Sequence, residues 1–126
     1  MELTLNDYRV SALNIINEKT PSENQDIKMS YQYGIRMDNE SHCSVKTIST
    51  LRLADEDEQE DKTFYIQMDI EGFFSFKEMD KNLLLKKSAE ALLPLLRSHI
   101  ATAMASVGLD PIVIPLSRIK AFNNME

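Results

Sequence analysis

The chain has 126 residues, and 14 Lys and Arg against 20 Asp and Glu give it a formal net charge of −6. This length suits one domain, residues 1–126, which needs neither a disulfide nor a metal to bury a core. The negative charge disfavours nucleic acid and anionic membranes as partners. Cys43, the only cysteine, cannot form an internal bridge, and the first residues lack the long apolar region of a signal peptide, so we expect a cytoplasmic protein. Arg97 and His99 interrupt the longest apolar stretch, which therefore predicts no membrane span.

Strand patterns fill the first part of the chain. Leu3 to Ile15 gives a weak strand signal with a break near Asn6 and Asp7, and residues 19–25 follow as a loop. From Ile27 to Met37 apolar and polar residues alternate strictly, which predicts a half-buried strand. A polar turn at residues 38–41 then leads into a second, less regular alternation from Cys43 to Leu53.

Residues 54–62 form an acidic connection, and alternation resumes from Phe64 to Phe76. Three long strands in meander order, with a fourth contributed by the N-terminal segment, predict an antiparallel sheet. Gly72 lies inside the last strand, where a glycine usually marks a bulge or a close backbone approach, so we expect that strand to bend there.

After Met79 the period changes to three and four. Apolar residues recur from Leu92 to Val107, and Gly108 predicts the end of a helix. Pro94 leaves two possibilities, because a helix either begins close to a proline or is kinked by it, so Leu83–Leu93 is either a separate piece or a kinked one. Asp110–Pro115 then predicts an extended strap, and Arg118–Met125 a short terminal helix.

The sequence offers few groups for catalysis. Three glycines do not make a phosphate-binding loop, and His42 and Cys43 are neighbours whose side chains point to opposite faces of a strand. His99 lies on the apolar helical stripe and has Leu95 and Ala103 four residues away, so it is interpreted as a packing residue and not as a metal ligand. The acidic run at 55–61 lacks the glycine and ligand spacing of a calcium loop. We therefore expect no enzyme, no metal and no cofactor.

The chain has more apolar side chains than one sheet face and one helix would bury. Seven Met, five Phe and four Tyr lie largely on the alternating strands. Such residues are usually core, but their number here indicates assembly or the binding of apolar ligands.

The order of these elements, together with two motifs, resembles the SecB family of export chaperones from about Leu3 to Phe122. The more specific motif is Leu92–Leu116 (LLPLLRSHIATAMASVGLDPIVIPL), in which Pro94, Arg97, Gly108 and Pro115 carry the match. The second is Ile70–Phe76 (IEGFFSF), which is similar to the glycine-aromatic end of the family's fourth strand.

The resemblance implies an α+β fold: a four-stranded antiparallel sheet followed by a long helix, a proline-containing strap and a short C-terminal helix. It also implies a dimer of dimers that holds unfolded or precursor polypeptides without ATP. By motif position the peptide-binding residues fall on Ile27, Met29, Tyr31, Ile119 and Phe122. The helix would supply the oligomer interface through Leu92, Leu96, His99, Ile100, Ala103 and Met104.

The chain departs from the family where a translocation motor would dock. The family member that works with the SecA ATPase uses acidic residues on the outer face of the sheet, whereas Tyr65 and Gln67 occupy the matching positions here. We therefore do not expect dedicated SecA docking. Two alternatives to an export chaperone stay open, a chaperone dedicated to a toxin–antitoxin pair and a non-chaperone oligomeric interaction protein of the same fold.

Overall fold

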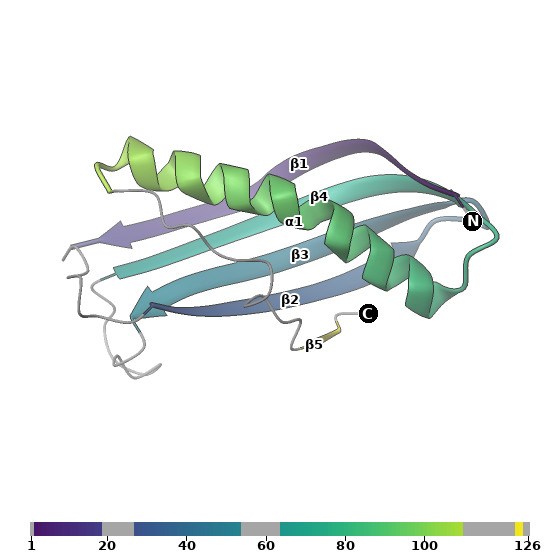
Figure 1. Ribbon diagram of the computed structural model, residues 1–126, viewed down its shortest axis with the longest axis horizontal. Helices are drawn as coiled ribbons and strands as arrows, with labels where there is room; N and C mark the ends of the chain where they lie inside the picture. Colours follow the sequence, from purple (N-terminus) through teal and green to yellow (C-terminus); the bar gives the residue numbers. More distant parts are fainter. Residues whose placement is uncertain (1, 19–26, 54–63, 110–122, 125–126) are drawn as a thin grey trace.

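The computed structural model describes residues 2–18, 27–53, 64–109 and 123–124. Along the chain these residues form β1 (Glu2–Asn17), β2 (Ile27–Met37), β3 (His42–Leu53), β4 (Phe64–Lys77), α1 (Lys81–Ser106) and β5 (Asn123–Asn124). The four long strands make one sheet, and α1 lies across one of its faces (Figure 1). This arrangement confirms the predicted antiparallel sheet followed by a long helix. No helix in the described residues combines the length and apolar character that crossing a membrane requires.

The sheet has the strand order β1-β4-β3-β2-β5. β2, β3 and β4 form the predicted meander, and β1 pairs antiparallel with the other side of β4. The tight turn between β2 and β3 is stabilised by Asn39, whose side-chain oxygen accepts from the Ser41 amide at 2.8 Å. β1 and β2 are thus consecutive in the sequence but lie on opposite sides of the β3–β4 pair.

β1 explains why the N-terminal strand signal is weak. Its pairing with β4 shifts register twice, between Leu5 and Asp7 and between Val10 and Ala12. Each shift inserts an extra residue, so the side chains that face α1 change from odd to even positions and back again. The break predicted near Asn6 is therefore a bulge inside one continuous strand.

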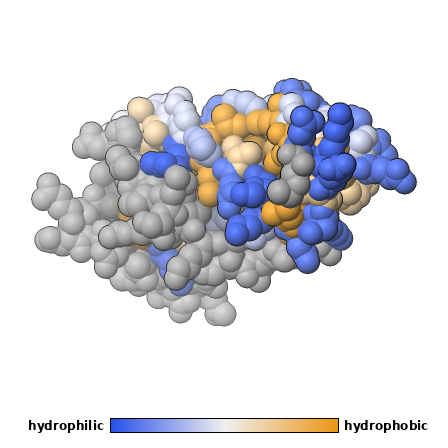
Figure 2. All heavy atoms as spheres, turned by 45° about the vertical axis from the view of Figure 1, so that its right-hand side comes forward, coloured by the Kyte–Doolittle hydropathy of each residue, from blue (hydrophilic) through white to orange (hydrophobic). Residues whose placement is uncertain are grey.

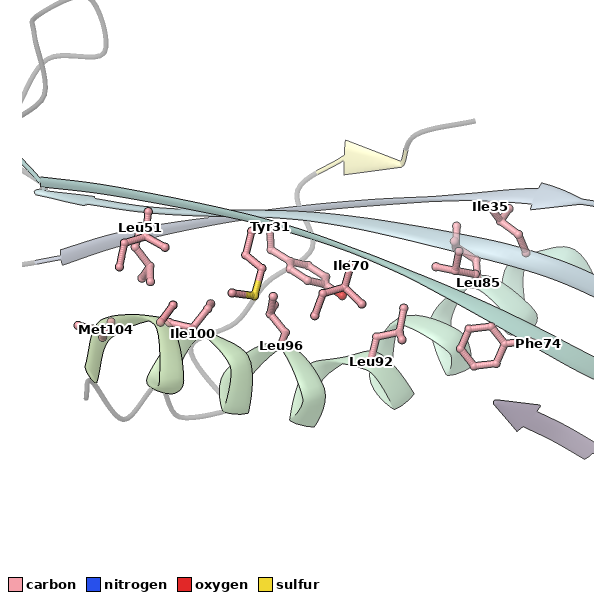
Figure 3. Packing of buried hydrophobic residues seen from close by; sticks show 14 of the residues in the cluster. Tyr31, Ile35, Leu51, Ile70, Phe74, Leu85, Leu92, Leu96, Ile100 and Met104 are labelled. Atoms are coloured by element: carbon pink, nitrogen blue, oxygen red, sulfur yellow. The ribbon is translucent and has the colours of Figure 1, made fainter. Parts of the chain in front are cut away.

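The core lies between α1 and the sheet face that carries the alternating apolar residues. Nine helix residues are buried there: Leu84, Leu85, Ser88, Ala89, Leu92, Leu96, Ile100, Ala103 and Met104. In Figure 3, Leu92, Leu96 and Ile100 point from α1 toward the strands, and Ile70 and Tyr31 point back. The hydroxyls of Thr47 and Ser49 on this face donate to the Ile70 and Met68 carbonyl oxygens at 3.2 and 2.9 Å, so both are satisfied inside the core.

Gly72 is a point of close approach. β4 runs through it without a register shift, pairing Gly72 with Tyr8 on one side and Val45 on the other, so the bulges belong to β1 and not to β4. A Cβ atom at position 72 would lie 2.8 Å from Leu92 Cδ2. The glycine therefore lets α1 press its fully buried Leu92 against the sheet.

Both ends of α1 are capped. The Asp80 carboxylate accepts from the Leu83 amide at 2.8 Å, and Gly108 adopts φ 82°. The Gly108 and Leu109 amides donate to the Ala105 and Met104 carbonyl oxygens, which is a Schellman motif. The predicted stop at Gly108 is confirmed.

α1 also settles the question left open by Pro94. The helix is continuous from Lys81 to Ser106, so Leu83–Leu93 belongs to it. Pro94 and Glu90 are both exposed, and water can therefore satisfy the carbonyl that the proline leaves without an amide.

The C-terminal prediction is corrected in one respect. Residues 110–122, with the predicted strap and most of the predicted last helix, lie outside the described residues. Asn123 and Asn124, predicted as helix, form strand β5, which pairs parallel with Gln32 and Tyr33 of β2. Asparagine is a poor helix former, and the edge of β2 offers backbone partners that periodicity in the sequence does not reveal.

Tyr31→Phe is expected to leave stability unchanged or to raise it. The Tyr31 hydroxyl is buried and has no hydrogen-bond partner within the described chain, so its desolvation is uncompensated. Removing it should change the free energy of unfolding by 0 to about +2 kcal/mol, measured by urea denaturation. The control is Tyr33→Phe, at a half-buried site. A clear loss of stability in Tyr31→Phe alone would contradict the expectation.

Gly72→Ala is expected to destabilise the fold by about 1–3 kcal/mol, because the added methyl group overpacks the contact with Leu92. Leu92→Ala should cost about 2–5 kcal/mol through the cavity it leaves. The double variant should lose less than the sum of the two, since the truncated side chain makes room for the methyl group. Additive losses in thermal or urea unfolding would show that the two residues do not compete for the same space.

Candidate functional site

The predicted peptide-binding residues of β2 share the face of the strand that looks toward α1. Ile27, Met29 and Tyr31 pair across the sheet with Leu53, Leu51 and Ser49 of β3. Ile27 and Met29 are half-buried against the core, whereas Tyr31 is only 2% exposed and reaches under α1 (Figure 3). The first two are accessible in part, and Tyr31 acts as a core residue in this conformation. Ile119 and Phe122 lie outside the described residues.

Tyr33 is a further candidate, which the resemblance did not single out. It is half-buried on the same face of β2, and its ring centroid lies 5.7 Å from that of Tyr31. Burial, and then the neighbouring Tyr33, raise the pKa of Tyr31, so its hydroxyl stays neutral at any physiological pH. The signal for Tyr33 was present in the sequence, because it continues the alternation of Ile27, Met29 and Tyr31.

The outer edge of β2 is the second part of the site. Along its whole length β2 pairs with β3, but on its other side only Gln32 and Tyr33 have a strand partner among the described residues, namely β5 (Figure 1). An edge strand presents backbone N–H and C=O groups to which another extended chain can bond. β2 contains Lys28 and Arg36 and no acidic residue. The site thus combines a row of apolar side chains, a backbone edge and a positive charge.

The predicted oligomer residues of α1 divide into two groups. Leu92, Leu96, Ile100, Ala103 and Met104 are buried against the sheet of their own chain. His99 is half-buried beside β1, where its Nε2 lies 3.1 Å from the Tyr8 hydroxyl and the two rings meet edge to face. A partner subunit meeting α1 would therefore contact the opposite side of the helix, which exposes Ala91, Pro94, Ser98, Thr102 and Ala105. That α1 forms an interface at all stays a prediction.

Apolar surface also gathers along β1, the other edge of the four long strands. Val10 is 37% and Leu13 51% exposed, and their register partners Ile70 and Met68 are fully buried on the face that carries α1. On the side of the molecule brought forward in Figure 2, apolar side chains form a band framed by hydrophilic ones. Val10 and Leu13 therefore leave apolar surface exposed along β1.

The outer face of the sheet, opposite α1, is polar and internally paired. Arg9 donates to Glu71 at 2.6 Å and lies over the Phe73 ring. Tyr65 donates to Gln67, which donates in turn to the buried Asp69 at 3.2 Å. Both carboxylates of β4 on this face are therefore already engaged.

His42 and Cys43 cannot work as a catalytic pair in this arrangement. His42 lines an open hollow of about 280 Å³ with Glu2, Thr4, Ser41, Ser75, Phe76 and Lys77. Ser41 Oγ and Asn39 Oδ1 both contact His42 through Nδ1, at 3.0 and 3.1 Å, whereas a proton relay needs one partner on each ring nitrogen. Cys43 is buried on the other face, and burial, then the charge of Asp38, raise the pKa of its thiol to about 11. A neutral, inaccessible thiol is a poor nucleophile.

Comparison with known proteins finds a similar solved structure but no similar sequence. No family model matches the chain, and no curated protein sequence is significantly similar to it. The fold, however, is similar to the Rv1957 SecB-like chaperone of Mycobacterium tuberculosis, solved in complex with a ChAD peptide from the Rv1956 HigA1 antitoxin, with a TM-score of 0.71 over 90% of this chain and 89% of that one. The two sequences are 14% identical. The likeness therefore establishes the fold, and the chain has the SecB-like architecture that its motifs predicted.

Proposed function

We propose that this chain is an ATP-independent holdase that binds unfolded polypeptides along β2. The observation that carries the proposal is the half-buried row of Ile27, Met29 and Tyr33 in a SecB-like fold, beside an edge with few backbone partners among the residues that the structure describes. Apolar side chains of a bound segment would pack against the row, and its backbone would pair with the strand. Methionine suits such a surface, because its flexible thioether repacks around different partners.

Two features bear on which polypeptides are bound. The structural relative was solved with a peptide from an antitoxin, which favours a chaperone for a toxin–antitoxin pair as the second candidate function. Precursors for export are the other class of partner, but the paired carboxylates of Asp69 and Glu71 offer no free acidic patch on β4 for a motor such as SecA. A dedicated chaperone would bind one segment far more tightly than unrelated unfolded chains, and an export chaperone would not.

The holdase proposal is tested by light scattering of an unfolded, aggregating protein. At molar excess the chain should slow aggregation, and ATP should not alter the effect. Met29→Asp should weaken binding about tenfold or more, because a carboxylate replaces an apolar contact worth at least 1.4 kcal/mol. Failure of the wild-type chain to slow aggregation of any such protein would refute the proposal.

Ser30→Asp is the matched control for Met29→Asp. It places the same charge on the same strand but on the opposite face, beside Thr50 of β3. Both variants should keep the circular dichroism spectrum of the wild type. If Ser30→Asp weakened binding as much as Met29→Asp, the apolar row would not be the binding surface.

We also propose that the chain assembles, as a dimer of dimers, through the uncovered side of α1 and the apolar edge of β1. Light scattering coupled to size exclusion should then give the mass of four chains. Ser98→Arg, at the middle of the exposed side of α1, should lower that mass without unfolding the chain, whereas Asn82→Arg, in the first turn, should not. A wild-type monomer would contradict the proposed assembly.

A further inference from the structure

β5 occupies the middle of the strand edge to which binding is assigned. It pairs parallel with Gln32 and Tyr33, the sixth and seventh residues of the 11-residue β2. Four residues of β2 lie beyond it toward Met37 and five toward Ile27. In Figure 1, β5 lies alongside β2, next to the end of the chain and away from β1.

Only one strand can pair with this edge at a time. β2 already gives one side of its backbone to β3 along its full length, from Ile27 to Met37. The N–H and C=O groups on the other side form a single row, which one extended chain satisfies. A bound segment that crosses the middle of β2 must therefore displace β5.

β5 pairs only weakly with the centre of the β2 edge. β5 has two residues, both asparagine, a residue type depleted in strands. Its pairing is a two-residue ladder at the edge, a small part of the contact that an unfolded polypeptide could make along 11 residues. A longer segment with apolar side chains would gain both the ladder and the row of Ile27, Met29 and Tyr33.

We propose that β5 is an intramolecular competitor, which covers the centre of the β2 edge in the free chain and is released when an extended polypeptide pairs there. This inference rests on the proposed holdase function and adds its regulation. The preferred partner is a segment that alternates apolar residues with polar or acidic ones. Its apolar side chains face the row, and its other side chains lie on the side of Lys28, on a strand that has no acidic residue.

Competition by β5 predicts how much the affinity for a peptide changes when β5 can no longer pair with β2. Replacing both Asn123 and Asn124 by Pro removes their amide donors and prevents the ladder. Affinity should then rise by roughly three- to tenfold, because the binding-competent state no longer has to be released from β5. The probe is a fluorescent peptide that alternates valine with serine and glutamate, and its affinity is measured by anisotropy.

Two controls isolate backbone pairing. The double variant Asn123→Ala and Asn124→Ala keeps both amides and should bind the probe like the wild type. A probe with alternate amides N-methylated should bind more weakly than its parent to every variant, since it cannot complete a ladder. In the free protein, the amides of residues 31–34 that do not pair with β3 should exchange about three- to tenfold more slowly in the wild type than in the proline variant.

The outcomes separate this inference from the proposed function. If the proline variant binds the probe and slows aggregation like the wild type, β5 is not a competitor while the holdase function stands. Equal exchange of these amides in the wild type and the proline variant would overturn the inference in the same way. If neither wild type nor variant binds the probe or slows aggregation, the proposed function fails and the inference falls with it.

Discussion

The structure depends on one contact, the packing of α1 against the sheet at Gly72. Leu92 reaches the strands there, since no side chain at position 72 keeps it away. Leu96, Ile100 and Met104 continue the same stripe toward the end of the helix, where the Schellman motif buries Leu109 beside them. The helix is thereby held across the strands, and its position decides which strand residues become core and which stay within reach of solvent.

This packing gives the side chains on one face of β2 different exposures to solvent. Tyr31 lies under the helix, whereas Met29, Ile27 and Tyr33 on the same face are only half covered. Two-residue alternation puts all four side chains on one face but carries no information on where a helix crosses that face. Four residues that follow the same alternation in the sequence therefore become one core residue and three partly exposed residues.

The edges of the sheet follow from its strand order. β1 and β2 end up on opposite sides of the β3–β4 pair, so each has one flank that β3 and β4 do not cover. β1 carries two bulges and exposed apolar residues, and β2 carries β5. Bulges and short covering strands are two ways in which proteins limit uncontrolled pairing at an edge. At the β2 edge the short covering strand comes from the chain itself, through Asn123 and Asn124.

Periodicity, turn residues and capping residues determined the four strands and the end of the helix at Gly108, because these are local properties of the backbone. Gly72 left a bulge or a close approach open, and the packing of Leu92 decided for the close approach. The resemblance in Leu92–Leu116 and Ile70–Phe76 indicated the fold despite 14% identity to its structural relative. Tertiary structure alone decided that the helix runs through Pro94, that β1 keeps one face inward through two bulges, and that Tyr31, Leu92 and Leu96 serve the chain's own core. It also decided that Asn123 and Asn124 pair with β2. Each of these depends on which segments distant in the sequence meet, and neither side-chain period nor composition encodes that meeting.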